Sequence, residues 1–179
     1  MDKVSFTGST ATGKKILQSC SSSLKRVTLE MGGNDPAIVC ADVDIAAIVP
    51  KLAMISFTNS GQLCLAVKRL YVHESIYETF LAALVSFVES HLKVGYGEDE
   101  TTFIGPITHR AQYDRVKDLL AYIESNSLKV ATKSYRQTDY SGLFIPPVIL
   151  DNPPDDSRPV VEEAFGTFTR QVSRTRTHN

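Results

Sequence analysis

The chain has 179 residues, of which 42% are hydrophobic and 22% are charged, and its formal net charge is -1. This length and composition allow one ordinary domain, or parts of two, with a substantial buried core. The balanced charge argues against a nucleic-acid or anionic-membrane partner. The sequence contains no apolar run of 18 residues, so it predicts no transmembrane helix. We expect a cytoplasmic protein.

The cysteines at positions 20, 40 and 64 are odd in number and widely separated, and none belongs to a C-x-x-C pair. This spacing favours free thiols in a reducing compartment over a disulfide framework or a zinc site. The four histidines show no metal-ligand spacing either. The sequence therefore predicts no metal site.

Strands and helices are predicted to alternate along the chain, which indicates an α/β fold. The predicted strands are 4–7, 26–31, 37–40, 69–73, 129–131 and 144–150. The predicted helices are 11–22, a segment from Asp42 or Asp44 to before Asn59, a long amphipathic segment opened by Ser75, and 111–124. Pro50 is expected to kink or interrupt the second of these helices.

The last thirteen residues, TFTRQVSRTRTHN, differ in composition from the rest of the chain, with four Thr, three Arg and no acid. They have almost no apolar period. We expect residues 167–179 to form a disordered tail.

The first predicted strand runs into Gly8, and the segment from Gly8 to Lys15 is one residue from a nucleotide-triphosphate loop. That loop needs Ser or Thr after its lysine to ligate Mg²⁺, and Lys15 stands there instead. The residues leave two other interpretations open. The turn serves only packing, or it presents backbone N–H groups and a helix N-terminus to a dinucleotide pyrophosphate.

Two further motifs bear on this choice. Glu30-Met31-Gly32-Gly33 is followed by Gly61-Gln62-Leu63-Cys64, with Cys64 34 residues after Glu30. Together with FTGSTATG, IGPI and VVEEAFG, these motifs closely resemble the aldehyde dehydrogenase superfamily. The resemblance runs from Val4 to about Gly166.

The resemblance implies a partial Rossmann-type cofactor domain followed by most of an α/β catalytic domain. We assign residues 1–33 to the end of the dinucleotide-binding domain and 34–166 to the catalytic domain. The family continues with Pro where this chain has Thr167. We therefore expect a chain truncated at both ends, whose tail results from a reading-frame change or an unspliced intron.

The resemblance also implies oxidation of an aldehyde to a carboxylic acid with NAD or NADP, through a thiohemiacetal and a thioester on Cys64. A thiolate suits both steps because it is a strong nucleophile and a good leaving group. Glu30 would be the base that activates the hydrolytic water. The implied cofactor-binding residues are Gly8, Ser9, Met31, Gly32, Gln112, Arg115, Glu163 and Phe165.

The family is typically homo-oligomeric, but we expect its pairing strand to be absent from this chain. A small-molecule aldehyde is the implied partner. The alternative is a catalytically inactive remnant of an aldehyde dehydrogenase.

Overall fold

The computed structural model describes residues 1–136 and 140–175, and the side chains of residues 1–136 and 140–168. The chain divides into two compact units, Met1–Gly33 and Asn34–Asn179. The assignment of these units to a cofactor-binding and a catalytic segment stays a prediction.

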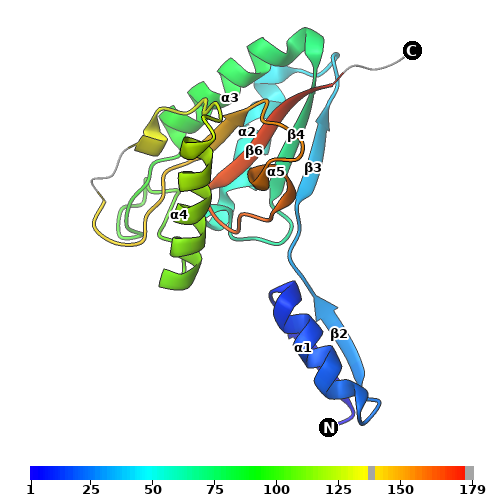
Figure 1. The fold of residues 1–179 in the computed structure, drawn as a ribbon. Helices are drawn as coiled ribbons and strands as arrows, with labels where there is room; N and C mark the ends of the chain where they lie inside the picture. The colour runs from blue at the N-terminus through cyan, green and yellow to red at the C-terminus, as the bar shows by residue number, and fades with distance from the viewer. Residues whose placement is uncertain (137–139, 176–179) are drawn as a thin grey trace. The chain divides into compact units, whose positions relative to one another are not determined.

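The first unit is a strand, a helix and a second strand (Figure 1). Strand β1 (Lys3–Thr7) pairs in parallel with β2 (Arg26–Glu30), and α1 (Thr10–Ser21) connects them. Ser9 caps α1, since its side chain accepts a hydrogen bond from Thr12 N. A Cβ at Gly13 would lie 2.8 Å from Met31 Sδ, so the missing side chain lets α1 pack closely on the strand side of the unit.

The second unit is built on a four-stranded parallel sheet (Figure 1). Its strands, in spatial order, are β3 (Asp35–Val39), β4 (Val67–His73), β6 (Phe168–Thr175) and β5 (Val148–Asp151). Its helices are α2 (Ile45–Phe57), α3 (Tyr77–His91), α4 (Arg110–Ser125) and α5 (Arg158–Val161). Short 3-10 turns are η1 (Thr58–Gly61), η2 (Glu74–Ile76) and η3 (Ser134–Arg136). The predicted α/β class is confirmed.

Helices cover both faces of this sheet, and each face has its own hydrophobic core. Side chains alternate between the two faces of a strand, and β5 shows this directly. Ile149 packs into the core formed by α2, α3 and β4, whereas Val148 and Leu150 pack into the core formed with α4. The sheet is thus the middle of three layers.

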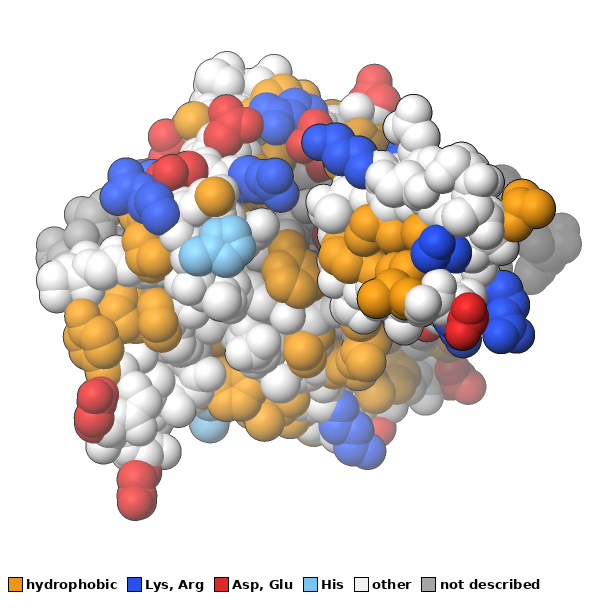
Figure 2. All heavy atoms as spheres, turned by 90° about the horizontal axis from the view of Figure 1, so that it is seen from below, with side chains coloured by type: hydrophobic (Ala, Val, Ile, Leu, Met, Phe, Trp, Pro, Cys, Tyr) orange, Lys and Arg blue, Asp and Glu red, His pale blue; other side chains and the backbone are white. Residues whose placement is uncertain are grey.

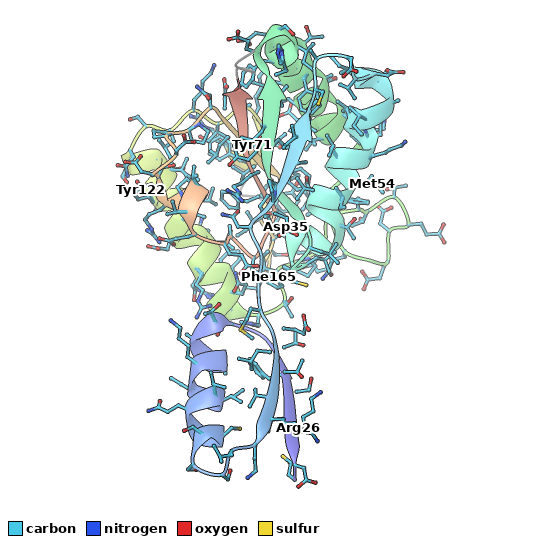
Figure 3. The ribbon with its side chains drawn as sticks, turned by 90° about the vertical axis from the view of Figure 1, so that its right-hand side faces the viewer. Arg26, Asp35, Met54, Tyr71, Tyr122 and Phe165 are labelled. Atoms are coloured by element: carbon cyan, nitrogen blue, oxygen red, sulfur yellow. The ribbon has the colours of Figure 1, made fainter. Side chains whose placement is uncertain are left out.

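Apolar side chains also reach the surface among charged ones, as one face of the molecule shows (Figure 2). In the second unit Ile38 on β3 is 77% exposed and Met54 on α2 is 43% exposed. Met54 lies on the side of α2 that faces away from the sheet (Figure 3). Within the part of the chain that the structure describes, no helix is both long and apolar enough to cross a membrane.

The expectation of a disordered tail is wrong for residues 168–175. They form β6, which pairs in parallel with β4 on one side and with β5 on the other. Thr167 is fully buried just before this strand, and its Oγ1 donates to the carbonyl of Ile145 at 2.8 Å. The strand is ordered by backbone pairing with β4 and β5, which are distant in sequence, so the local composition does not reveal it. Residues 176–179 lie outside the described part of the chain.

Other boundaries also differ from the predictions. Pro50 lies inside α2 without interrupting it, and Asp44 rather than Asp42 caps that helix through Ala47 N. The predicted strand at 129–131 is only a single bridge between Val130 and Leu150. Strand β5 begins at Val148 rather than at residue 144, and the short helix α5 was not predicted.

The two sides of α2 give a direct test of the core. Phe57 is fully buried and Met54 is 43% exposed. Replacing Phe57 by Ala should lower the free energy of unfolding by about 3–5 kcal/mol, because it leaves a cavity in the core. Met54→Ala on the same helix should cost about 1 kcal/mol or less. Urea unfolding of the two variants measures the difference, and equal effects would contradict the assigned core.

The place of β6 can be tested with proline. Val172 is paired with Leu70 of β4 in the middle of the sheet. Val172→Pro removes a backbone donor from an interior strand, so the second unit should lose its cooperative unfolding transition. Val172→Thr keeps the backbone N–H and should retain the transition. A Val172→Pro chain that unfolds like the parent would show that these residues are not an interior strand.

Candidate functional site

Cys64 lies on the turn that leads from η1 into β4, and its side chain is exposed. The backbone N–H of Ala66 donates to the carbonyl of Leu63 at 3.2 Å, which closes the turn around Cys64. The thiol is therefore accessible from solvent on a short, closed piece of backbone. It is one of two exposed thiols among the described residues, with Cys40, whereas Cys20 is buried.

The backbone before Cys64 has an uncommon conformation. Asn59, Ser60 and Gly61 have φ values of 52°, 56° and 70°, so three successive residues are left-handed. This conformation costs about 1 kcal/mol or more for a residue with a side chain. Ser60 Oγ stabilises it by donating to the carbonyl of Gly105 at 2.9 Å.

Gln62 holds the turn from the other side. Its side chain is only 6% exposed, and its Nε2 donates to the carbonyl of Asn59 at 3.2 Å. Its Oε1 accepts from Thr108 N at 2.9 Å and from Thr108 Oγ1 at 2.7 Å. The Gly-Gln-x-Cys motif marked this position in the sequence, but not its role as an anchor.

Lys68 lies beneath the turn at the start of β4. It is 1% exposed, and its Nζ donates to the carbonyl of Gly61 at 2.5 Å and to that of Gly166 at 3.3 Å. A Cβ at Gly61 would lie only 2.0 Å from the Gly166 oxygen. The backbones at 61 and 166 are thus in direct contact, and sequence reasoning missed Lys68.

The segment before Gly166 carries two of the predicted cofactor residues. Glu163 is exposed and Phe165 is partly exposed; Figure 3 labels Phe165. Gln112 of α4 donates from its Nε2 to the carbonyl of Phe165 at 2.9 Å. The structure therefore brings Gln112 and Phe165 together, while Arg115 lies exposed on the same helix.

Arg158 fixes this segment to α4 and was also missed from the sequence. Its guanidinium donates to Glu162 at 2.7 Å and to Asp118 at 2.9 Å, and it lies 5.3 Å from the centre of the Tyr122 ring. Hydrogen bonds to Glu162 and then to Asp118 raise the pKa of Arg158 above its ordinary value. Glu162 pairs with Arg158, and the assignment of Glu163 as the cofactor residue stays a prediction.

In the first unit, Glu30 is exposed at the end of β2, and its backbone carbonyl accepts from Gly8 N at 3.0 Å. The Gly8 turn and Glu30 therefore lie side by side at the carboxyl ends of the two strands. Met31 is partly buried and Gly32 is exposed. These residues, with Ser9, form one continuous edge of the unit.

The same edge is incompatible with a triphosphate loop. Only Gly8 and Ser9 separate β1 from α1, so residues 10–12, which would wrap a triphosphate, are already helical. The first turn of α1 carries no acidic residue, and the side chains of Ser9 and Thr10 are exposed. A helix N-terminus of this kind attracts a single anionic group through its backbone N–H groups.

No metal is indicated at either edge. Among residues 1–136 and 140–168, no group of three or more His, Cys, Asp or Glu side chains could hold a metal ion. The second unit offers an accessible thiol on an anchored turn, and the first unit offers an exposed carboxylate and an anion-attracting helix terminus.

Known proteins share this arrangement of sequence and fold. A model of the aldehyde dehydrogenase family matches residues 1–173, which extends past Gly166 into β6. A probable aldehyde dehydrogenase of a Pseudomonas species is 39% identical over 164 residues, which are 92% of this chain and 33% of that protein. The resemblance at the motifs therefore continues further than we expected.

Two solved structures extend the likeness to the fold. The NAD+ complex of an aldehyde dehydrogenase from Bacillus cereus matches 99% of this chain and 36% of its own, with a TM-score of 0.91 and 34% identity. A cysteine-to-alanine mutant of aldehyde dehydrogenase C from Pseudomonas syringae, complexed with NAD+ and octanal, matches 98% of this chain and 36% of its own. Its TM-score is 0.89 at 29% identity.

The chain spans about a third of the length of the curated relatives and solved structures that it matches. The family model covers nearly every residue of this chain and includes the motifs around Glu30 and Cys64 that suggested the relationship. The chain belongs to the aldehyde dehydrogenase family.

Proposed function

We propose that this chain carries the nucleophile, the hydrolytic base and part of the cofactor site of an enzyme that oxidises an aldehyde to a carboxylic acid. The observation that carries the proposal is the setting of Cys64. Its thiol is exposed, while Gln62 and Lys68, which anchor its turn, are both buried. A side chain held this way is suited to reach a substrate without moving the backbone.

In this proposal the Cys64 sulfur attacks the carbonyl carbon of the aldehyde, forming a carbon–sulfur bond and a thiohemiacetal. Negative charge that develops on the oxygen needs a donor, and the backbone N–H of Cys64 is the candidate within this chain. Oxidation of the thiohemiacetal leaves a thioester. Sulfur is then the leaving group when water attacks.

Glu30 is the proposed base for that water. The carboxylate takes one proton from the water as the water oxygen adds to the thioester carbon. The carbon–sulfur bond then breaks, which releases the carboxylic acid product and the Cys64 thiol. Glu30 is exposed at a strand end, so its side chain is open to solvent from which the water is drawn. Its assignment rests on the Glu-x-Gly-Gly motif.

The proposed cofactor is NAD or NADP, whose nicotinamide supplies the hydride acceptor of the oxidation. This assignment is supported by the N-terminus of α1 in the first unit, which has no acidic residue in its first turn. Gly8 and Ser9 would hold the pyrophosphate there, with Met31 and Gly32 beside them. In the second unit, Glu163, Phe165, Gln112 and Arg115 are proposed contacts to the ribose and nicotinamide.

Two solved structures of relatives support the ligand classes. One Bacillus cereus structure is an NAD+ complex, and the Pseudomonas syringae structure holds NAD+ and octanal. The rival is a family member that folds without turnover.

The activity test is the appearance of NADH when the purified chain is mixed with NAD and a simple aldehyde. Cys64→Ala should abolish the signal, because no thiohemiacetal can form. Cys40→Ala removes the other exposed thiol and should leave the rate unchanged. A flat trace from folded chain would support the inactive rival, and a signal that survives Cys64→Ala would contradict the assigned nucleophile.

Glu30→Gln separates the base from the nucleophile. If Glu30 acts only on the hydrolytic water, the variant should form NADH once per Cys64. Its later steady rate should then be at least about a hundredfold lower than that of the parent. The rapid first turnover and the later steady rate are read from one absorbance trace. Loss of the first turnover together with the steady rate would assign Glu30 to an earlier step.

A further inference from the structure

We infer that Lys68 is a positioning residue that couples residues 59–64, the Cys64 turn, to the segment 163–166. Lys68 contributes a buried ammonium group, which donates to a carbonyl from each of these pieces of chain. That Cys64 is the nucleophile rests on the proposed function, whereas the coupling itself does not.

The two acceptors converge because of the sheet. Lys68 is the second residue of β4, and Gly166 precedes β6, the parallel neighbour of β4. The amino ends of parallel neighbours meet at the same edge, so the carbonyls of Gly61 and Gly166 come together there. Two carbonyl oxygens that share a buried site repel one another, and an ammonium group that donates to both removes this cost.

The contact leaves little room for either segment to move alone. Gly61 abuts the Gly166 oxygen, since a Cβ at 61 would lie 2.0 Å from it. On its other side Gly166 abuts α4, because a Cβ at 166 would lie 2.8 Å from Val116 Cγ2. A shift at Gly61 is therefore transmitted to Gly166 and to its neighbour Phe165.

Lys68 also acts against the strain of the Cys64 turn. Asn59 and Ser60 both hold left-handed conformations, which asparagine tolerates but the side chain of Ser60 disfavours. The bond from Lys68 to the Gly61 carbonyl ties down the last of the three left-handed residues. Without it, the turn can relax toward ordinary backbone angles and carry Cys64 away from its place.

The first test is hydrogen exchange on the full chain, comparing Lys68→Met with the parent. Met fills similar space but cannot donate, so two buried carbonyls lose a partner. We expect exchange to become about tenfold to a hundredfold faster in peptides covering both 59–66 and 162–168, with α3 unchanged. Lys51→Met, at an exposed position of α2, is the matched control and should change neither segment. Opening of only one segment, or of neither, would overturn the coupling.

If Lys68→Met loosens the whole second unit, Gly61→Ala decides instead. It keeps the ammonium group and presses a methyl group against the Gly166 carbonyl. Joint opening of the two segments in this variant supports the coupling. Opening of 59–66 alone refutes it.

The second readout is the rate of alkylation of Cys64 relative to Cys40, both exposed in the same chain. In Lys68→Met this ratio should shift toward the value measured for the chain unfolded in urea, because the turn is no longer held. Lys68→Arg keeps the cation and should retain the parent ratio. A ratio that is the same in all three proteins would show that Lys68 does not position Cys64, whatever the outcome of the activity test.

Discussion

A buried ammonium group must be surrounded by polar atoms, and much of the second unit's site is arranged to meet this requirement for Lys68. The carbonyls of Gly61 and Gly166 approach it from two distant pieces of chain. Neither position has space for a side chain, because a Cβ at Gly61 would press on the Gly166 carbonyl and a Cβ at Gly166 on Val116. The locations of Cys64 and Phe165 follow, since each lies within three residues of one of these glycines.

The two units present their chemistry at opposite ends of their strands. In the first unit, Gly8 follows β1 and Glu30 is the last residue of β2. Both lie at the carboxyl edge, where open α/β sheets commonly bind ligands. In the second unit, Cys64 and Gly166 precede β4 and β6, at the amino edge. The topological rule therefore points to the proposed anion site from strand order, but it would direct a search for the thiol to the other edge of its sheet.

Local signals in the sequence were sufficient for much of the fold. The apolar spacing of α4 predicted a helix whose Val116, Leu119 and Ile123 are buried, and Asp44 was one of two caps proposed for α2. The motifs around Glu30 and Cys64 predicted the family. Strand β6 was missed because its order comes from backbone pairing to two neighbours. Lys68 was missed because a lysine in sequence resembles a surface residue, and only the fold shows that it is buried.

The position of β6 has a consequence for how the protein is made. This strand lies between β4 and β5 but follows both in the chain, and Lys68 is separated from Gly166 by 98 residues. During synthesis, β4 leaves the ribosome long before its second neighbour exists, with one edge open to wrong partners. The pairing of β1 with β2 joins residues of one short segment and can form early. The sheet of the second unit cannot be completed before β6 is synthesised. We therefore expect the nascent chain to need chaperones from the emergence of β4 to the emergence of β6.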